Sequence, residues 1–124
     1  MSACVFCEII AKTRPAEVVT EDDKFIAFLD IRPRSPGHTL VDPKKHERWV
    51  WDVEPQAEYW LLARRIARAQ QKAFAAEAVW CTVIGDEVLH AHIWVYPHPA
   101  TKGDRSDLPG NAQRLRQALK LLGV

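Results

Sequence analysis

The sequence predicts an α+β fold, in which helices pack against an antiparallel sheet, in one domain that spans residues 1–124. Short segments rich in β-branched and aromatic residues alternate with longer amphipathic segments. The connections between these segments are short, and no internal repeat is found. Short connections favour antiparallel pairing of neighbouring strands.

The first half of the chain is expected to supply a short helix and three strands. We place the helix within residues 4–11 and the strands at residues 18–20, 25–29 and 39–41. The second of these strands has the length and the β-branched and aromatic content of a buried strand. Pro33, Pro36 and Gly37 lie in the loop that follows it, where they end one strand and turn the chain into the next.

The second half is expected to supply two helices that flank a β-hairpin. Apolar residues recur at helical spacing through residues 55–77: Leu62, Ile66, Ala69 and Ala73. Residues 79–84 and 88–96 predict two strands joined by a tight turn at Gly85-Asp86-Glu87. Cys81 stands among apolar neighbours and is expected to be a buried thiol. The last helix is placed at residues 111–122.

Composition restricts the function classes. A formal net charge of +1 argues against a nucleic-acid partner, which would favour a strong basic excess. The uncharged stretches are too short to cross a bilayer, so we expect no membrane association. The first residues contain no secretory signal, which predicts a cytoplasmic protein whose three cysteines stay reduced.

Histidines gather on the predicted hairpin. On a strand, alternate residues share a face, so His90, His92 and Trp94 should project together, about 6.7 Å between successive members. In one interpretation, the two histidines are simply half-buried on a sheet surface. In the other, one imidazole acts as a nucleophile toward phosphorus near pH 7, while the other binds zinc.

The Cys4-Val5-Phe6-Cys7 segment allows three interpretations: half of a zinc site, a redox dithiol, or two structural thiols. A redox motif would follow a strand within a βαβ unit, and nothing of this kind precedes Cys4. Zinc would need two further ligands, which His46 and one of the hairpin histidines could supply.

Five ordered motifs resemble those of the histidine triad (HIT) family, most closely its bacterial branch related to nucleoside phosphoramidases. They are Cys4-Val5-Phe6-Cys7-Glu8-Ile9-Ile10, Phe28-Leu29-Asp30-Ile31-Arg32-Pro33, Pro36-Gly37-His38-Thr39-Leu40-Val41, Pro43-Lys44-Lys45-His46 and His90-Ala91-His92-Ile93. The resemblance implies a five-stranded HIT-like protomer with two main helices, paired into a homodimer with a ten-stranded sheet.

The resemblance also implies a site for a purine nucleotide or an AMP- or GMP-type conjugate. The residues that it assigns to the base are Val5, Phe6, Ile9, Phe28 and Ile31. Asp30 would accept hydrogen bonds from the ribose hydroxyls, since a carboxylate is purely an acceptor. Gly85, in the turn that replaces a longer family loop, is assigned to the nucleotide site as well.

By the same resemblance, His92 attacks the α-phosphate and forms a nucleotidyl-histidine that water then releases. The implied zinc ligands are Cys4, Cys7, His46 and His90. His38 is assigned to the catalytic site as a residue that helps to orient it.

The chain departs from the family at the third triad position, where Trp94 replaces histidine. An indole offers one fixed N–H and no proton transfer, so Trp94 weakens support for the leaving group. Asp86 and Glu87 add charge near the phosphate. The sequence therefore predicts a slow or differently selective nucleotidyl hydrolase. The alternatives are a HIT-like module that binds purine nucleotides or scaffolds without turnover, and a purely structural zinc module.

Overall fold

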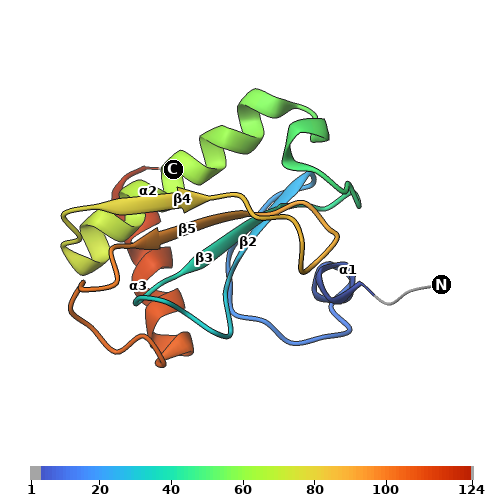
Figure 1. Cartoon of the computed structure of the whole chain (residues 1–124). Coiled ribbons are helices and arrows are strands. Elements are labelled where there is room, and N and C mark those ends of the chain that lie inside the picture. The colour runs from blue at the N-terminus through green and yellow to red at the C-terminus, as the bar shows by residue number, and fades with distance from the viewer. Residues whose placement is uncertain (1–3, 124) are drawn as a thin grey trace.

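Five strands form one antiparallel sheet in the order β1-β2-β3-β5-β4 (Figure 1). The computed structural model describes residues 4–123. The strands are β1 (Val18–Glu21), β2 (Phe25–Leu29), β3 (Thr39–Pro43), β4 (Val79–Thr82) and β5 (Ile93–Pro97). The helices are α1 (Val5–Ile10), α2 (Gln56–Phe74) and α3 (Leu108–Leu121), with a 3-10 turn η1 at Val50–Asp52. The predicted α+β class and the antiparallel pairing of β2 with β3 are confirmed.

Both faces of the sheet are covered (Figure 1), which explains why all five residues of β2 are buried. Phe25, Ala27 and Leu29 face a large core beneath α2 and α3. Ile26 and Phe28 face a smaller core under α1, together with Phe6, Ile9 and Leu40. Period-two alternation thus divides β2 between two cores.

The helices end where local geometry stops them. Ala75 adopts the left-handed conformation with φ 50°, so α2 ends at Phe74 and not at residue 77 as predicted. The Phe74 ring then packs over Gly37, where a Cβ would collide with it. α3 begins three residues earlier than expected, since the Asp107 carboxylate accepts a hydrogen bond from Gly110 N at 3.1 Å.

The predicted tight hairpin turn is wrong. β4 pairs with β5 only from Val79 opposite Pro97 to Thr82 opposite Trp94, and residues 83–92 form a loop between them. His90 and His92 therefore lie in this loop, just before β5. Contacts outside the hairpin hold the loop: Ala91 N donates to Glu47 O at 2.7 Å. The expected alternation survives in part, because Ala91, like Ile93, faces the large core.

Cys81 is exposed, contrary to the prediction of a buried thiol. β4 is one of the two edge strands of the sheet, and its middle residues, Trp80 and Cys81, are both open to solvent. Within residues 4–123, no helix has the length and apolar character that a membrane span requires.

Gln70 joins α2 to the two segments that carry site residues. Its amide is fully buried and donates to Gly37 O at 2.9 Å and to Val95 O at 2.8 Å. Gly37 precedes His38, and Val95 follows Trp94. One side chain therefore fixes the loop before β3 relative to β5.

We expect Gln70→Leu to lower the free energy of unfolding by about 2 to 3 kcal/mol, since two buried carbonyls would each lose one hydrogen bond. Urea denaturation measures this loss. The matched control is Gln71→Leu on the exposed side of α2, which should change stability by about 0.5 kcal/mol or less. Equal effects of the two variants would contradict the bridging role.

Candidate functional site

Four side chains from three separate segments converge beside α1. The ligand atoms of Cys4, Cys7, His46 and His90 all lie within 4.8 Å of one another. Cys7 Sγ is 3.2 Å from His46 Nδ1 and 3.5 Å from His90 Nδ1, and the two imidazole Nδ1 atoms are 3.1 Å apart. Ligands of a tetrahedral zinc ion at 2.0–2.3 Å would be about 3.3–3.8 Å apart, so the four residues fit such an ion.

The backbone places these ligands. Cys4 is the N-cap of α1, and its Sγ accepts from Cys7 N at 3.4 Å, so the first turn of the helix brings both thiols together. Burial, and secondarily Cys4, raises the pKa of the Cys7 thiol to about 11. A bound dication acts in the opposite direction, because it stabilises a thiolate.

A hydrogen bond selects the tautomer of His90. Its Nε2 donates to Pro43 O at 2.8 Å, which leaves the lone pair on Nδ1 directed at the cysteines and His46. Burial lowers the pKa of His90 and keeps the imidazole neutral, as metal binding requires.

His92 has the opposite tautomer to His90, with the proton on Nδ1. Its Nδ1 donates to His90 O at 2.7 Å, so Nε2 keeps a free lone pair. The ring is 6% exposed and contacts Phe6 edge-on, with centroids 5.0 Å apart. Burial lowers the pKa of His92, although the carboxylates of Asp30 and Glu87 oppose this effect. A neutral imidazole with an unoccupied Nε2 is a nucleophile.

His38 lies in the core of the site, where it cannot exchange protons near neutral pH. It is 1% exposed, and burial lowers its pKa to about 4. Its Nδ1 accepts from Arg34 N at 3.1 Å, while its Nε2 is 3.7 Å from Asp30 Oδ2. The other oxygen of Asp30 accepts from Arg32 N at 2.9 Å. His38 therefore links the loop at Arg34 to Asp30, and its assignment to the catalytic site stays a prediction.

Trp94 contacts both His38 and Arg34. Its ring centroid lies 5.2 Å from that of His38, and the Arg34 guanidinium carbon lies 4.5 Å above the indole. The indole Nε1 is buried and has no acceptor within residues 4–123. Sequence reasoning missed Arg34, because it is an isolated charge in an irregular loop and no periodicity points to it.

The residues assigned to the base lie at one end of the sheet but differ in exposure. Phe6, Ile9 and Phe28 are only 2–8% exposed and contact mainly protein in the small core, whereas Ile31 is 75% exposed beside Asp30. Val5 is partly buried at the edge of that core.

Gly85 lies in the long loop, with φ +79° and its carbonyl bonded to the Arg48 guanidinium. A Cβ at this position would approach Trp49 to 3.0 Å. Asp86 and Glu87, which follow it, are exposed. Gly85 therefore has a conformational role in the loop, and its contact with a nucleotide stays a prediction.

The fold is a five-stranded antiparallel sheet, and two histidines directly precede β5. Comparison with known proteins shows which family combines these features. Residues 11–100 match the family model described as HIT domain. The chain therefore belongs to the histidine triad (HIT) family.

Individual relatives agree with this assignment. An uncharacterised HIT-like protein of Mycobacterium tuberculosis is 40% identical over 101 residues, which cover 76% of this chain and 70% of that protein. The bifunctional adenosine 5'-phosphosulfate phosphorylase/adenylylsulfatase of Arabidopsis thaliana is 36% identical over 76 residues, 61% of this chain and 52% of that enzyme. The zinc-bound histidine triad family protein of Mycobacterium smegmatis has a TM-score of 0.84 and 32% identity, covering 98% of this chain and 96% of that one.

We expect the purified protein to contain about one zinc ion per chain, and Cys7→Ser to lose it and melt about 5 °C lower or more. Atomic emission spectroscopy and thermal unfolding measure the two effects. Cys81→Ser, at the exposed cysteine of β4, is the matched control and should keep the metal. A wild-type protein that holds no zinc and is insensitive to a chelator would contradict this assignment.

Proposed function

We propose that this protein is a zinc-containing nucleotidyl hydrolase or transferase that attacks the α-phosphate of a purine nucleotide conjugate through His92. One observation carries the proposal: His90 O holds His92 Nδ1–H at 2.7 Å, which leaves the nucleophilic Nε2 free. Membership of the HIT family supports it.

In the proposed reaction, His92 Nε2 forms a bond to the α-phosphorus as the bond to the leaving group breaks. The leaving group departs with the electron pair, and the nucleotidyl-histidine keeps its Nδ1–H on His90 O. Water then attacks the same phosphorus, a P–O bond forms as the P–N bond breaks, His92 regains its lone pair, and the proton of the water passes to solvent. Asp30 would bind the ribose hydroxyls.

Cys4, Cys7, His46 and His90 would hold the zinc ion, which would fix the backbone carbonyl that orients His92. The buried bond from His90 Nε2 to Pro43 O supports this role. Attack on phosphorus requires that the His92 ring stay in one orientation. A fixed His90 would favour this, because its carbonyl accepts the hydrogen bond from His92 Nδ1.

The name of one relative and the motifs of this chain support a proposal for the substrate class. The Arabidopsis relative acts, by its name, on adenosine 5'-phosphosulfate, and the motifs of this chain resemble those of nucleoside phosphoramidases. Both classes join an α-phosphate to a group that leaves. We propose AMP- or GMP-type conjugates of this kind as substrates.

A second function is favoured by Trp94. Because this residue cannot transfer a proton, the chain could bind purine nucleotides and scaffold partners without turnover. In that case, nucleotide would bind at equilibrium, but no nucleotidyl-protein and no product would form.

The free edge of the sheet supports a homodimer. β4 is the last strand, and an unpaired edge offers N–H and C=O groups to a second copy. Trp80 on this strand is 44% exposed. We propose that two β4 strands pair and extend the sheet to ten strands. We also propose that the dimer is cytoplasmic, where Cys4 and Cys7 stay reduced. Cell fractionation tests this location.

We expect His92→Ala to lower turnover of nucleoside phosphoramidates at least about 10³-fold, because it removes the nucleophile. Rapid acid quench with radiolabelled substrate should trap a nucleotidyl-protein in the wild type only. His98→Ala, at an exposed histidine, is the control and should retain activity. Full activity in His92→Ala would refute covalent catalysis at this residue.

Sedimentation equilibrium should give a dimer for the wild type, whereas Trp80→Lys should shift it to monomer by placing charge at the paired edge. Lys102→Glu, a charge change elsewhere on the exposed surface, should leave the dimer intact. A wild-type monomer at all accessible concentrations would exclude β4 pairing.

A further inference from the structure

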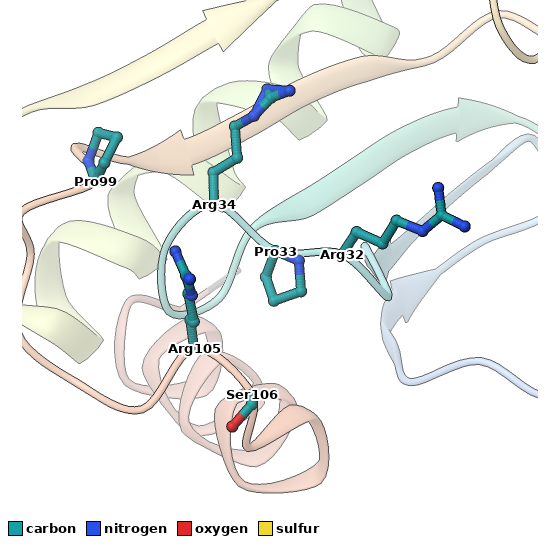
Figure 2. Close-up of a pocket in the computed structure, with 6 residues that line it drawn as sticks. All are labelled: Arg32, Pro33, Arg34, Pro99, Arg105 and Ser106. Carbon is teal, nitrogen blue, oxygen red and sulfur yellow. The ribbon is translucent and has the colours of Figure 1, made fainter.

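A cavity of about 440 Å³ opens beside the loop that follows β2. Its lining residues are Arg32, Pro33, Arg34, Pro99, Arg105 and Ser106. Figure 2 shows Arg34 and Arg105 extending in the same direction, whereas Arg32 points away from them. Within residues 4–123, none of the three guanidinium groups forms an ion pair with a carboxylate. The cavity therefore carries uncompensated positive charge.

Arg34 is held in place at both ends. Its backbone N–H donates to His38 Nδ1 at 3.1 Å, and its guanidinium lies 4.5 Å above the Trp94 ring. Stacking on an aromatic face uses the charge of the group but leaves its planar N–H donors available. Within the described part of the chain, these donors have no acceptor in the protein, so they can bind a ligand.

The position of Trp94 relates Arg34 to the nucleophile. Trp94 follows His92 by two residues, and both point away from the large core that Ala91 and Ile93 enter. Residues two apart in extended chain are separated by about 6.7 Å. We therefore place the guanidinium stacked on Trp94 beside the group that leaves from a phosphorus at His92, and not at the position of the nucleophile itself.

The chemistry of this position selects one kind of leaving group. The Trp94 indole is no proton donor in catalysis, so an amine, which must be protonated to depart, receives no help. A phosphate or sulfate departs as an anion without a proton. A planar guanidinium binds the oxygens of such a group in bidentate fashion and stabilises the charge that develops on them.

We propose that Arg34 is a specificity-determining residue that binds an anionic leaving group, so that the favoured substrates are nucleotides whose α-phosphate is joined to phosphate or sulfate. This inference rests on the proposed function. In the step, His92 Nε2 bonds to the α-phosphorus, the bond from phosphorus to the bridging oxygen breaks, and that oxygen keeps the electron pair beside Arg34. No proton has to be supplied.

Binding tests the inference without turnover. AMP and ADP differ only in the second phosphate, which would occupy the leaving-group position. In a His92→Ala background, calorimetry should show that ADP binds more tightly than AMP. Adding Arg34→Gln should weaken ADP about 10- to 100-fold and change AMP by less than about twofold. The matched control is Arg64→Gln on the exposed side of α2, which should change neither ligand.

Enzyme kinetics provide a second test of the role of Arg34. Arg34→Gln should lower kcat/KM for adenosine 5'-phosphosulfate by a similar factor and leave an adenosine phosphoramidate with a neutral amine almost unchanged. Equal losses on both substrates, or equal affinities for AMP and ADP in the His92→Ala protein, would overturn the role of Arg34. Absence of a nucleotidyl-protein in the wild type would overturn the proposed catalysis instead, and the binding difference would still decide the role of Arg34.

Discussion

The hydrogen bond from His90 Nε2 to Pro43 O, 2.8 Å long, connects the parts of the site. It anchors the loop before β5 to the end of β3, and it directs His90 Nδ1 toward the cysteines and His46. The carbonyl of the same residue holds His92 Nδ1. The metal site and the orientation of the proposed nucleophile therefore share one residue, whose side chain serves the first and whose backbone serves the second. A displacement of His90 would disturb both.

Sequence patterns predicted the fold wherever local composition and burial agree. The Phe25–Leu29 strand was placed correctly, because five consecutive apolar residues suit a strand covered on both faces. The hairpin turn was wrong because Glu47, which bonds Ala91, is distant in sequence, and that contact holds the chain away from β4. The third strand was predicted to end at Val41, which is two residues too early. Asp42 and Pro43 continue it, and no sequence pattern predicts a carboxylate that is fully buried.

The site was predictable where motifs carry it. The cysteine pair and the paired histidines indicated a metal and a nucleophile, and tetrahedral coordination made His46 a candidate ligand. The family resemblance was needed to choose it, since nothing local relates a residue after β3 to the N-terminal helix. The sequence could not predict the position of Arg34, for a different reason. Its significance depends on lying above Trp94, and that stacking is set by the His38 contact and by the bridge from Gln70. Both are tertiary interactions between segments distant in sequence.

One feature of α1 bears on the life of the protein in the cell. The helix has six residues, fewer than an isolated helix needs for stability, and its cap is Cys4, a residue of the metal cluster. Binding of the ion would therefore stabilise the folded form of this segment. Without the ion, the segment would open more often and expose the apolar side chains of Phe6 and Ile9 to proteases. Metal supply would then control how long each molecule survives, in addition to how well it works.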